Sequence, residues 1–175
     1  MVSSKILSAI AGLLTIGSLA NVSAQNHVTL NSNGRDTAYV RVILERAAKN
    51  ISAVEIKDTA NYTSVRNIVA NRYFELNDIY AERDSLKKNP ETKALANVTC
   101  DSKLYRSHFA LNARLSLFLD EAQIVQVKDG ITMGVVKVTY DATCDMIPSL
   151  KDDEKAQIMA WLIEARELAL DAESS

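Results

Sequence analysis

The sequence predicts an all-α protein, a helical bundle of about five helices with an irregular crossover near residues 130–138. The first observation is a scarcity of turn-forming residues, because only three glycines and two prolines follow a predicted signal segment over residues 1–24. Sheet-rich domains use glycine and proline in their many turns, so this scarcity favours long helices joined by few connections. The second observation is composition, since Ala, Leu, Glu, Lys and Arg are plentiful and only 6% of residues are aromatic. The third is the recurrence of apolar residues at intervals of three and four.

The first residues indicate an export signal. Lys5 gives a small positive region, residues 6–20 form an apolar run, and Val22-Ser23-Ala24 matches a small-residue cleavage site. The alternative is a membrane anchor, but this run of about 15 residues is shorter than the roughly 20 that span a bilayer. We therefore expect cleavage near Ala24, a periplasmic or extracellular protein, and no membrane span in the mature chain.

The remaining chain has the size and charge of one ordinary domain. Removing Lys5 leaves 19 basic against 22 acidic residues, a net charge of −3. This small charge gives no electrostatic reason to expect a nucleic acid as partner. Residues 25–36 are polar and are expected to form a flexible leader, and residues 37–175 are expected to form a single helical domain.

Two helices are expected in the first half of this domain. Asp36 or Thr37 can cap a helix that runs to about Asn50, and a second helix is expected from Asp58 almost to Pro90. Each carries an apolar stripe at helical spacing, and the second stripe contains one charged residue, Arg72. The stripes are Tyr39, Val40, Ile43, Leu44 and Ala47, and then Val65, Ile68, Val69, Arg72, Tyr73, Leu76, Ile79, Tyr80 and Leu86.

The middle of the chain predicts shorter helices. Pro90 can open a helix, with an interruption expected over residues 97–101, and a firmer helix runs from residue 101 to about 118. A short helix over residues 122–128 begins after the acidic pair at 120–121 and ends at Gly130, where a positive φ is accessible.

The last part combines a crossover with a strongly patterned helix. Residues 131–138 are apolar and β-branched, and they are either extended and buried or an irregular crossover. The chain is expected to be helical again to about residue 146 and to stop before Pro148. Ser149 is the expected cap of the last helix. The apolar face of that helix is predicted to be Ile158, Trp161, Leu162, Ala165, Leu168 and Ala169.

The two cysteines predict a disulfide bond. Cys100 and Cys144 remain in a chain expected to reach an oxidising compartment, so we expect them to be bonded to each other. The alternative is two buried thiols that pack as small hydrophobic side chains.

Catalytic and metal-binding patterns are not visible. The chain has two histidines, His27 in the leader and His108, so a nucleophile with a partner base depends on His108 alone. There is no glycine-rich phosphate loop and no H-E-x-x-H sequence. We therefore expect no enzyme, no cofactor and no metal. A pair of carboxylates for glycoside hydrolysis stays an open alternative, because such a pair is defined by its distance in space and not by its spacing in the sequence.

The C-terminal third carries the motifs of a family. Lys128-Asp129-Gly130, then Gly134-Val135-Val136, and then Ala160-Trp161-Leu162-Ile163-Glu164-Ala165-Arg166-Glu167 resemble domain-of-unknown-function family 3826, small secreted bacterial proteins. The resemblance is dense over residues 120–175 and thinner over 36–118. It implies an exported protein with a sugar-binding description and no assigned site.

This chain departs from the family pattern in three ways. Lys137 stands where the family tends to have proline, and Cys144 replaces a bulkier side chain. The family usually continues past the position of Ser175 with a basic, aromatic-rich tail, so the resemblance implies a truncation at the C-terminus.

Two functions are consistent with these features. The first is a carbohydrate- or small-ligand-binding module, because sugar sites combine an aromatic side chain with a carboxylate or amide and an arginine. The alternative for its aromatic residues is burial in the core. The candidate ligand-binding residues are Trp161, Tyr140, Glu164, Arg166, Asp129 and His108, converging near the turn around Gly130 and Gly134.

The second function is a periplasmic chaperone-like or protein-interaction domain. Residues 119–123 and 150–154 resemble the helix starts of small envelope-stress chaperones. A large exposed apolar patch would favour this function.

Overall fold

A computed structural model describes residues 27–172 of the chain. All regular secondary structure in this range is helical, so the all-α prediction is confirmed. The helices are α1 (Thr37–Asn50), α2 (Thr59–Lys88), the 3-10 turn η1 (Lys93–Leu95), α3 (Ala96–Ser107), α4 (Ala110–Leu115), α5 (Glu121–Ile131), α6 (Val135–Met146) and α7 (Asp152–Ala169). None of the described helices is both long and apolar enough to span a membrane. The predicted signal peptide and its cleavage point lie outside the described residues.

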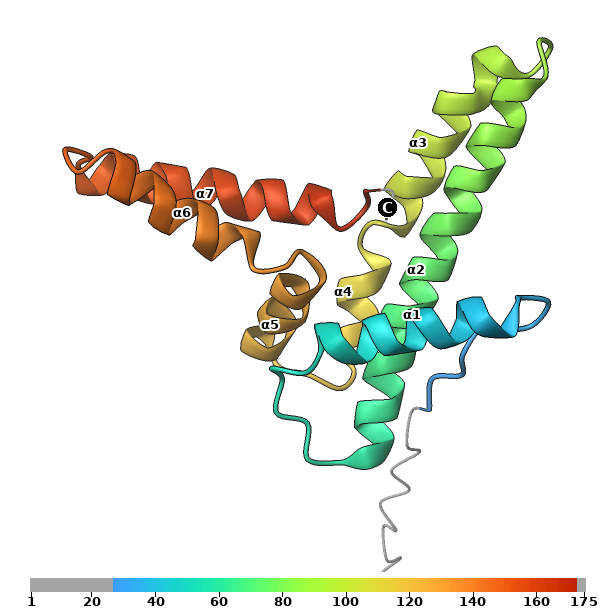
Figure 1. The fold of residues 1–175 in the computed structure, drawn as a ribbon, viewed down its shortest axis with the longest axis horizontal. Helices are drawn as coiled ribbons and strands as arrows, with labels where there is room; N and C mark the ends of the chain where they lie inside the picture. Colours follow the sequence, from blue (N-terminus) through green and yellow to red (C-terminus); the bar gives the residue numbers. More distant parts are fainter. Residues whose placement is uncertain (1–26, 173–175) are drawn as a thin grey trace, which may run out of the picture.

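The first two helices begin where their local caps predict. The carboxylate of Asp36 accepts a hydrogen bond from the Tyr39 amide at 2.9 Å, and that of Asp58 accepts one from Asn61 at 2.7 Å. Each bond satisfies an amide that has no partner within its helix. α1 crosses α2 near the middle of α2, at Tyr73 and Phe74 (Figure 1). The core lies where these two helices meet α4 and α5, with Phe74 1% exposed near its centre.

Part of the predicted leader, residues 28–31, packs against the first half of α2. The buried side-chain amide of Asn67 donates to the Val28 carbonyl at 2.8 Å. Asn71 donates to the Thr29 carbonyl at 2.9 Å and accepts from the Asn31 amide at 2.8 Å. Because these bonds pair buried amide groups with backbone, they fix this polar segment along α2.

The long helix expected over residues 101–118 is two helices. α3 starts at Ala96, so the expected interruption over residues 97–101 is helical, and the break falls instead at His108 and Phe109, between α3 and α4. α2 and α3 form a hairpin that projects from the core, and α4 returns along the lower part of α2 (Figure 1).

The expected crossover near residues 130–138 is shorter than predicted. α5 continues to Ile131, and only the three residues before Val135 separate it from α6. Both Met133 (φ 57°) and Gly134 (φ 66°) adopt the left-handed conformation that reverses the chain. Gly130 lies inside α5 and does not end it. Its role is to allow close approach, because a Cβ atom there would lie 1.8 Å from the Asn50 carbonyl oxygen of α1.

α6 and α7 form a second hairpin, which we call the C-terminal arm (residues 135–169). It projects away from the α2–α3 hairpin, and the end of α7 lies near the point where the two diverge (Figure 1). α7 starts after Lys151, so Ser149 is not its cap. Within the arm's two helices only Val136 and Arg166 are buried. The arm therefore has little core of its own.

The predicted disulfide between Cys100 and Cys144 is wrong. Cys100 is buried in α3 and Cys144 is half-buried in α6, and they do not form a disulfide with each other. The physical reason is the divergence of the two hairpins, which places the cysteines on different projections (Figure 1).

Candidate functional site

A cavity of 910 Å³ lies between α1, α2, α4, the α5–α6 turn and the end of α7. This volume falls within the roughly 300–1,000 Å³ typical of ligand pockets. Exposed residues at its rim, Glu45 and Lys49, mean that it opens to solvent. The lining residues are Val42, Glu45, Arg46, Lys49, Asn50, Ser52, Val69, Arg72, Tyr73, Leu76, Leu111, Gly130, Ile131, Met133, Ala169, Leu170 and Ala172.

Tyr73 and Asn50 form a polar pair in the cavity wall. The side-chain amide of Asn50 donates a hydrogen bond to the Tyr73 hydroxyl oxygen at 2.6 Å. Burial raises the pKa of Tyr73 and outweighs the lowering effects of this bond and of the Arg46 charge, so the hydroxyl keeps its proton. No described residue accepts that proton, and Arg46 lies 5.5 Å from the centre of the Tyr73 ring. The pair therefore has hydrogen-bonding capacity left for a ligand.

Arg72 reaches the cavity from the apolar face of α2 and is only 5% exposed. One terminal nitrogen donates to Glu75 and to the Ser107 hydroxyl, each at 2.9 Å, and the other pairs with the Asp171 carboxylate. Its Nε has no hydrogen-bond partner among the described residues. The two terminal nitrogens of Arg72 are thus held by hydrogen bonds, and its Nε–H is a donor without a partner among the described residues.

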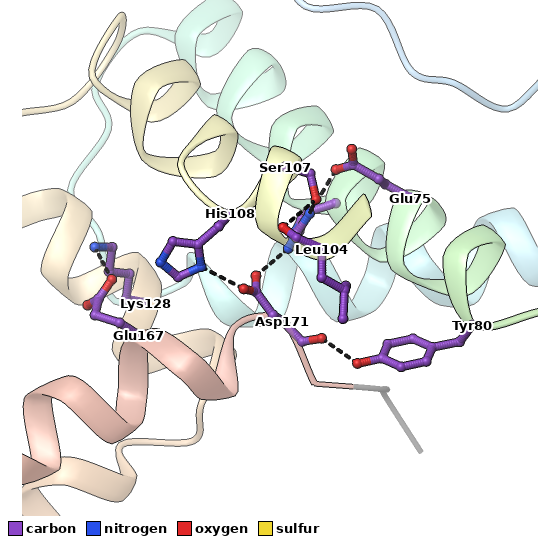
Figure 2. Close-up of polar contacts among 9 residues, drawn as sticks. Glu75, Tyr80, Leu104, Ser107, His108, Lys128, Glu167 and Asp171 are labelled. Atoms are coloured by element: carbon purple, nitrogen blue, oxygen red, sulfur yellow. Dashed lines mark hydrogen bonds and ion pairs between the residues drawn. The ribbon is translucent and has the colours of Figure 1, made fainter. Parts of the chain in front are cut away.

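Asp171 is the centre of this polar cluster (Figure 2). Besides binding Arg72, its carboxylate lies 2.6 Å from Nδ1 of His108, and its backbone carbonyl accepts a hydrogen bond from the Tyr80 hydroxyl at 2.7 Å. Residues from α2, from the α3–α4 junction and from the end of α7 therefore meet at one carboxylate. The cluster fixes Arg72 and ties the C-terminal arm to the rest of the protein.

A second ionic network joins α5 to α7. Arg166, 6% exposed, donates to Asp129 at 2.8 Å and to Glu167 at 3.1 Å, and Lys128 donates to Glu167 at 2.7 Å. Burial on its own raises the pKa of Glu167, but the bonds and charges of Lys128 and Arg166 outweigh it and leave this pKa below its ordinary value. This network positions the end of α7 beside the α5–α6 turn.

A smaller cavity of 510 Å³ lies between α2 and α3–α4. Two ion pairs lie across it, Arg35 with Asp78 at 2.6 Å and Lys103 with Glu82, whereas Arg106 and Arg114 form no ion pair with a described residue. The larger cavity has nearly twice the volume and a polar pair in its wall, so it is the better candidate site.

The structure brings together some of the residues predicted to bind a ligand. Asp129 and Arg166 form an ion pair, and His108 lies at the neighbouring Asp171 cluster. Tyr140 and Glu164 lie on the C-terminal arm and do not line the two cavities. Trp161 is 60% exposed on the same arm, so it belongs neither to the core nor to either cavity. Gly130 and Met133, at the turn where these residues were expected to converge, line the larger cavity.

The family model described as a protein of unknown function (DUF3826) matches residues 40–175. The chain belongs to the DUF3826 family. The resemblance found in the sequence is thereby confirmed. Every residue that lines the larger cavity lies within the part of the chain that matches the DUF3826 family. No curated protein matches the chain.

Sequence reasoning missed the main residues of this candidate site. Arg46, Lys49 and Asn50 lie at the end of the predicted first helix, which gave no sign of a cavity beside it. Arg72 did carry a signal, because it interrupts an otherwise apolar stripe of α2. A buried charge needs a partner, so its position indicated a polar cluster inside the fold.

Proposed function

We propose that this protein binds a small polyhydroxylated ligand, a saccharide, in the 910 Å³ cavity. The observation that carries the proposal is the combination of free hydrogen-bonding groups with an apolar floor. The Tyr73 hydroxyl and the side-chain amide oxygen of Asn50 have hydrogen-bonding capacity left. Val69, Leu76 and Leu111 supply apolar surface. Saccharides present hydroxyl groups and apolar C–H faces, and ligand pockets combine the same two kinds of surface.

The variant Asn50→Ala tests this proposal. We expect it to weaken saccharide binding at least tenfold, because it removes one amide from the cavity and leaves the Tyr73 hydroxyl without its partner. Isothermal titration calorimetry over a panel of plant and host glycans measures the effect. Asn112→Ala is the matched control, since Asn112 is exposed on α4 and does not line either cavity.

Trp161 distinguishes this site from the one expected on the C-terminal arm. Because it lies outside the cavity, its fluorescence should change little when a saccharide binds. Heat of binding without a fluorescence change supports the cavity. A fluorescence change that survives Asn50→Ala would place the ligand on the arm and contradict the proposal, and so would silence across the whole panel.

Protein interaction through the C-terminal arm is a second candidate function. Eight of the fifteen large apolar side chains that are exposed among the described residues lie on this arm or the turn before it. They are Met133, Val135, Val138, Met146, Ile147, Trp161, Ile163 and Leu168. Such a concentration of exposed apolar surface is typical of interaction sites.

The double variant Trp161→Ser, Leu168→Ser tests chaperone-like activity of the arm. If the arm holds unfolding proteins, wild type should suppress the thermal aggregation of citrate synthase, followed by light scattering, and the variant should lose most of that effect. Val98→Ser, Leu117→Ser removes two comparably exposed side chains elsewhere and should retain it. Equal suppression by both variants, or none by wild type, excludes this function.

A further inference from the structure

We infer that the ligand of the 910 Å³ cavity carries a carboxylate, so that the preferred saccharide is an acidic one such as a uronic acid. This inference rests on the proposed saccharide-binding function and adds the chemical class of the ligand. It follows from the charges and donors that line the cavity and that have no acceptor among the described residues.

Two unpaired positive charges lie in the cavity wall, in addition to the paired Arg72. Arg46 and Lys49 sit one turn apart on α1, and neither forms an ion pair with a described residue. Arg46 also lies over the Tyr73 ring, which keeps the guanidinium on the cavity side of α1. Cations that face a concave surface attract an anionic ligand more strongly than cations on a convex surface.

Deeper in the wall, Tyr73 supplies a donor that no described residue uses. Its hydroxyl accepts a hydrogen bond from Asn50, and the hydroxyl proton has no described acceptor. A buried donor left without an acceptor costs about 1–3 kcal/mol, and this cost is removed when a ligand oxygen accepts the bond. A carboxylate is a strong acceptor for such a donor, since hydrogen bonds to a charged group are about twice as strong as neutral ones.

The acidic residue in the wall explains why the ligand also carries hydroxyl groups. Glu45 lines the same cavity and repels an anion, but its oxygens accept hydrogen bonds from hydroxyls. Asn50 and Ser52 add further polar groups on the same side. A uronic acid carries both kinds of group. Its carboxylate would be bound by the two cations, and its hydroxyls by Glu45 and Asn50.

Calorimetry with a trisaccharide of galacturonic acid and with its fully methyl-esterified form tests the inference. The two ligands have the same rings and ring hydroxyls, and the ester lacks the negative charges. We expect the acid to bind at least tenfold more tightly, and we expect its affinity, but not that of the ester, to fall as salt is raised. The double variant Arg46→Gln, Lys49→Gln should abolish this preference. Lys87→Gln, Lys88→Gln removes the same charge at the exposed end of α2 and should keep it.

The outcomes separate the inference from the proposed function. Equal affinity for acid and ester overturns the inference and leaves saccharide binding in place. No binding of either form, together with a silent glycan panel, overturns both. Succinate, a carboxylic acid without hydroxyl groups, is the remaining probe. If it binds as tightly as the trisaccharide acid, the ligand is not an acidic saccharide and the inference is wrong.

Discussion

Replacing Asp171 with asparagine is expected to lower the free energy of unfolding by about 3 kcal/mol. The carboxylate of Asp171 pairs with Arg72, whose side chain is only 6% exposed, and with His108. Asparagine has nearly the same shape but no charge, so it leaves a buried guanidinium with Glu75 as its one acidic partner among the described residues. Breaking a buried pair in this way costs about 3–5 kcal/mol, and the remaining Glu75 contact places the effect at the lower end.

Urea unfolding followed by circular dichroism measures this loss, and Asp145→Asn is the control. Asp145 is exposed on α6 and forms no ion pair with a described residue, so its replacement should change stability by less than about 0.5 kcal/mol. The double variant Arg72→Met, Asp171→Asn should be less destabilised than the sum of its single variants. Additive effects would show that the pair does not stabilise the fold.

The variant Asp171→Asn also tests how the C-terminal arm is attached to the rest of the protein. Asp171 lies two residues beyond the end of α7, and its contacts to Arg72, Tyr80 and His108 tie the end of α7 to α2 and to the α3–α4 junction (Figure 2). We therefore expect amide hydrogen exchange at the end of α7 to accelerate more than exchange in α2. Uniform acceleration would mean that the arm does not open independently of the core.

Local signals were enough to predict most of the helices. Asp36 and Asp58 cap α1 and α2 because their carboxylates bond amides three residues ahead, a contact that depends only on nearby sequence. Tyr73 was correctly placed on an inward stripe for the same reason. Such features can be predicted because the atoms that decide them are neighbours along the chain.

The site could not be predicted in the same way, because its contacts join distant parts of the sequence. Arg72 meets Asp171 across 99 residues, and Asn50 meets Tyr73 across 23. Trp161 was predicted wrongly for a different reason. It belongs to an apolar stripe on α7, and that stripe predicted burial. α6 covers only part of that stripe, and Trp161 remains exposed. A periodic pattern predicts that a face is apolar, but not whether another element packs on it.

Gly130 was predicted to end a helix, and the structure gives it a different role. Near the end of a predicted helix, glycine indicated a C-terminal stop with positive φ, yet Gly130 lies within α5. Its lack of a side chain serves a contact with α1, 80 residues earlier in the sequence, where the Asn50 backbone packs against it. Since Asn50 also contributes to the cavity wall, this approach helps to define the candidate site.

Gly130→Ala is therefore expected to destabilise the protein by about 3 kcal/mol, the upper end of the usual cost of overpacking. Helix propensity alone predicts the opposite sign, because alanine is favoured over glycine inside a helix by about 1 kcal/mol. The steric effect dominates, since the new Cβ would lie 1.8 Å from the Asn50 oxygen and 2.8 Å from its carbonyl carbon. Both are backbone atoms and cannot rotate away, so α1 and α5 must separate.

Gly34→Ala is the control for this substitution. Gly34 has a φ of 74°, and a Cβ atom added there would meet no neighbouring atom within 4 Å. Alanine at this position should therefore cost only the roughly 1 kcal/mol of a left-handed backbone. Urea unfolding of the two variants compares the effects. Calorimetry should also show that Gly130→Ala weakens saccharide binding while Gly34→Ala does not, because only the first displaces Asn50. A Gly130→Ala variant as stable as wild type would mean that helix propensity dominates and that α5 does not pack closely on α1.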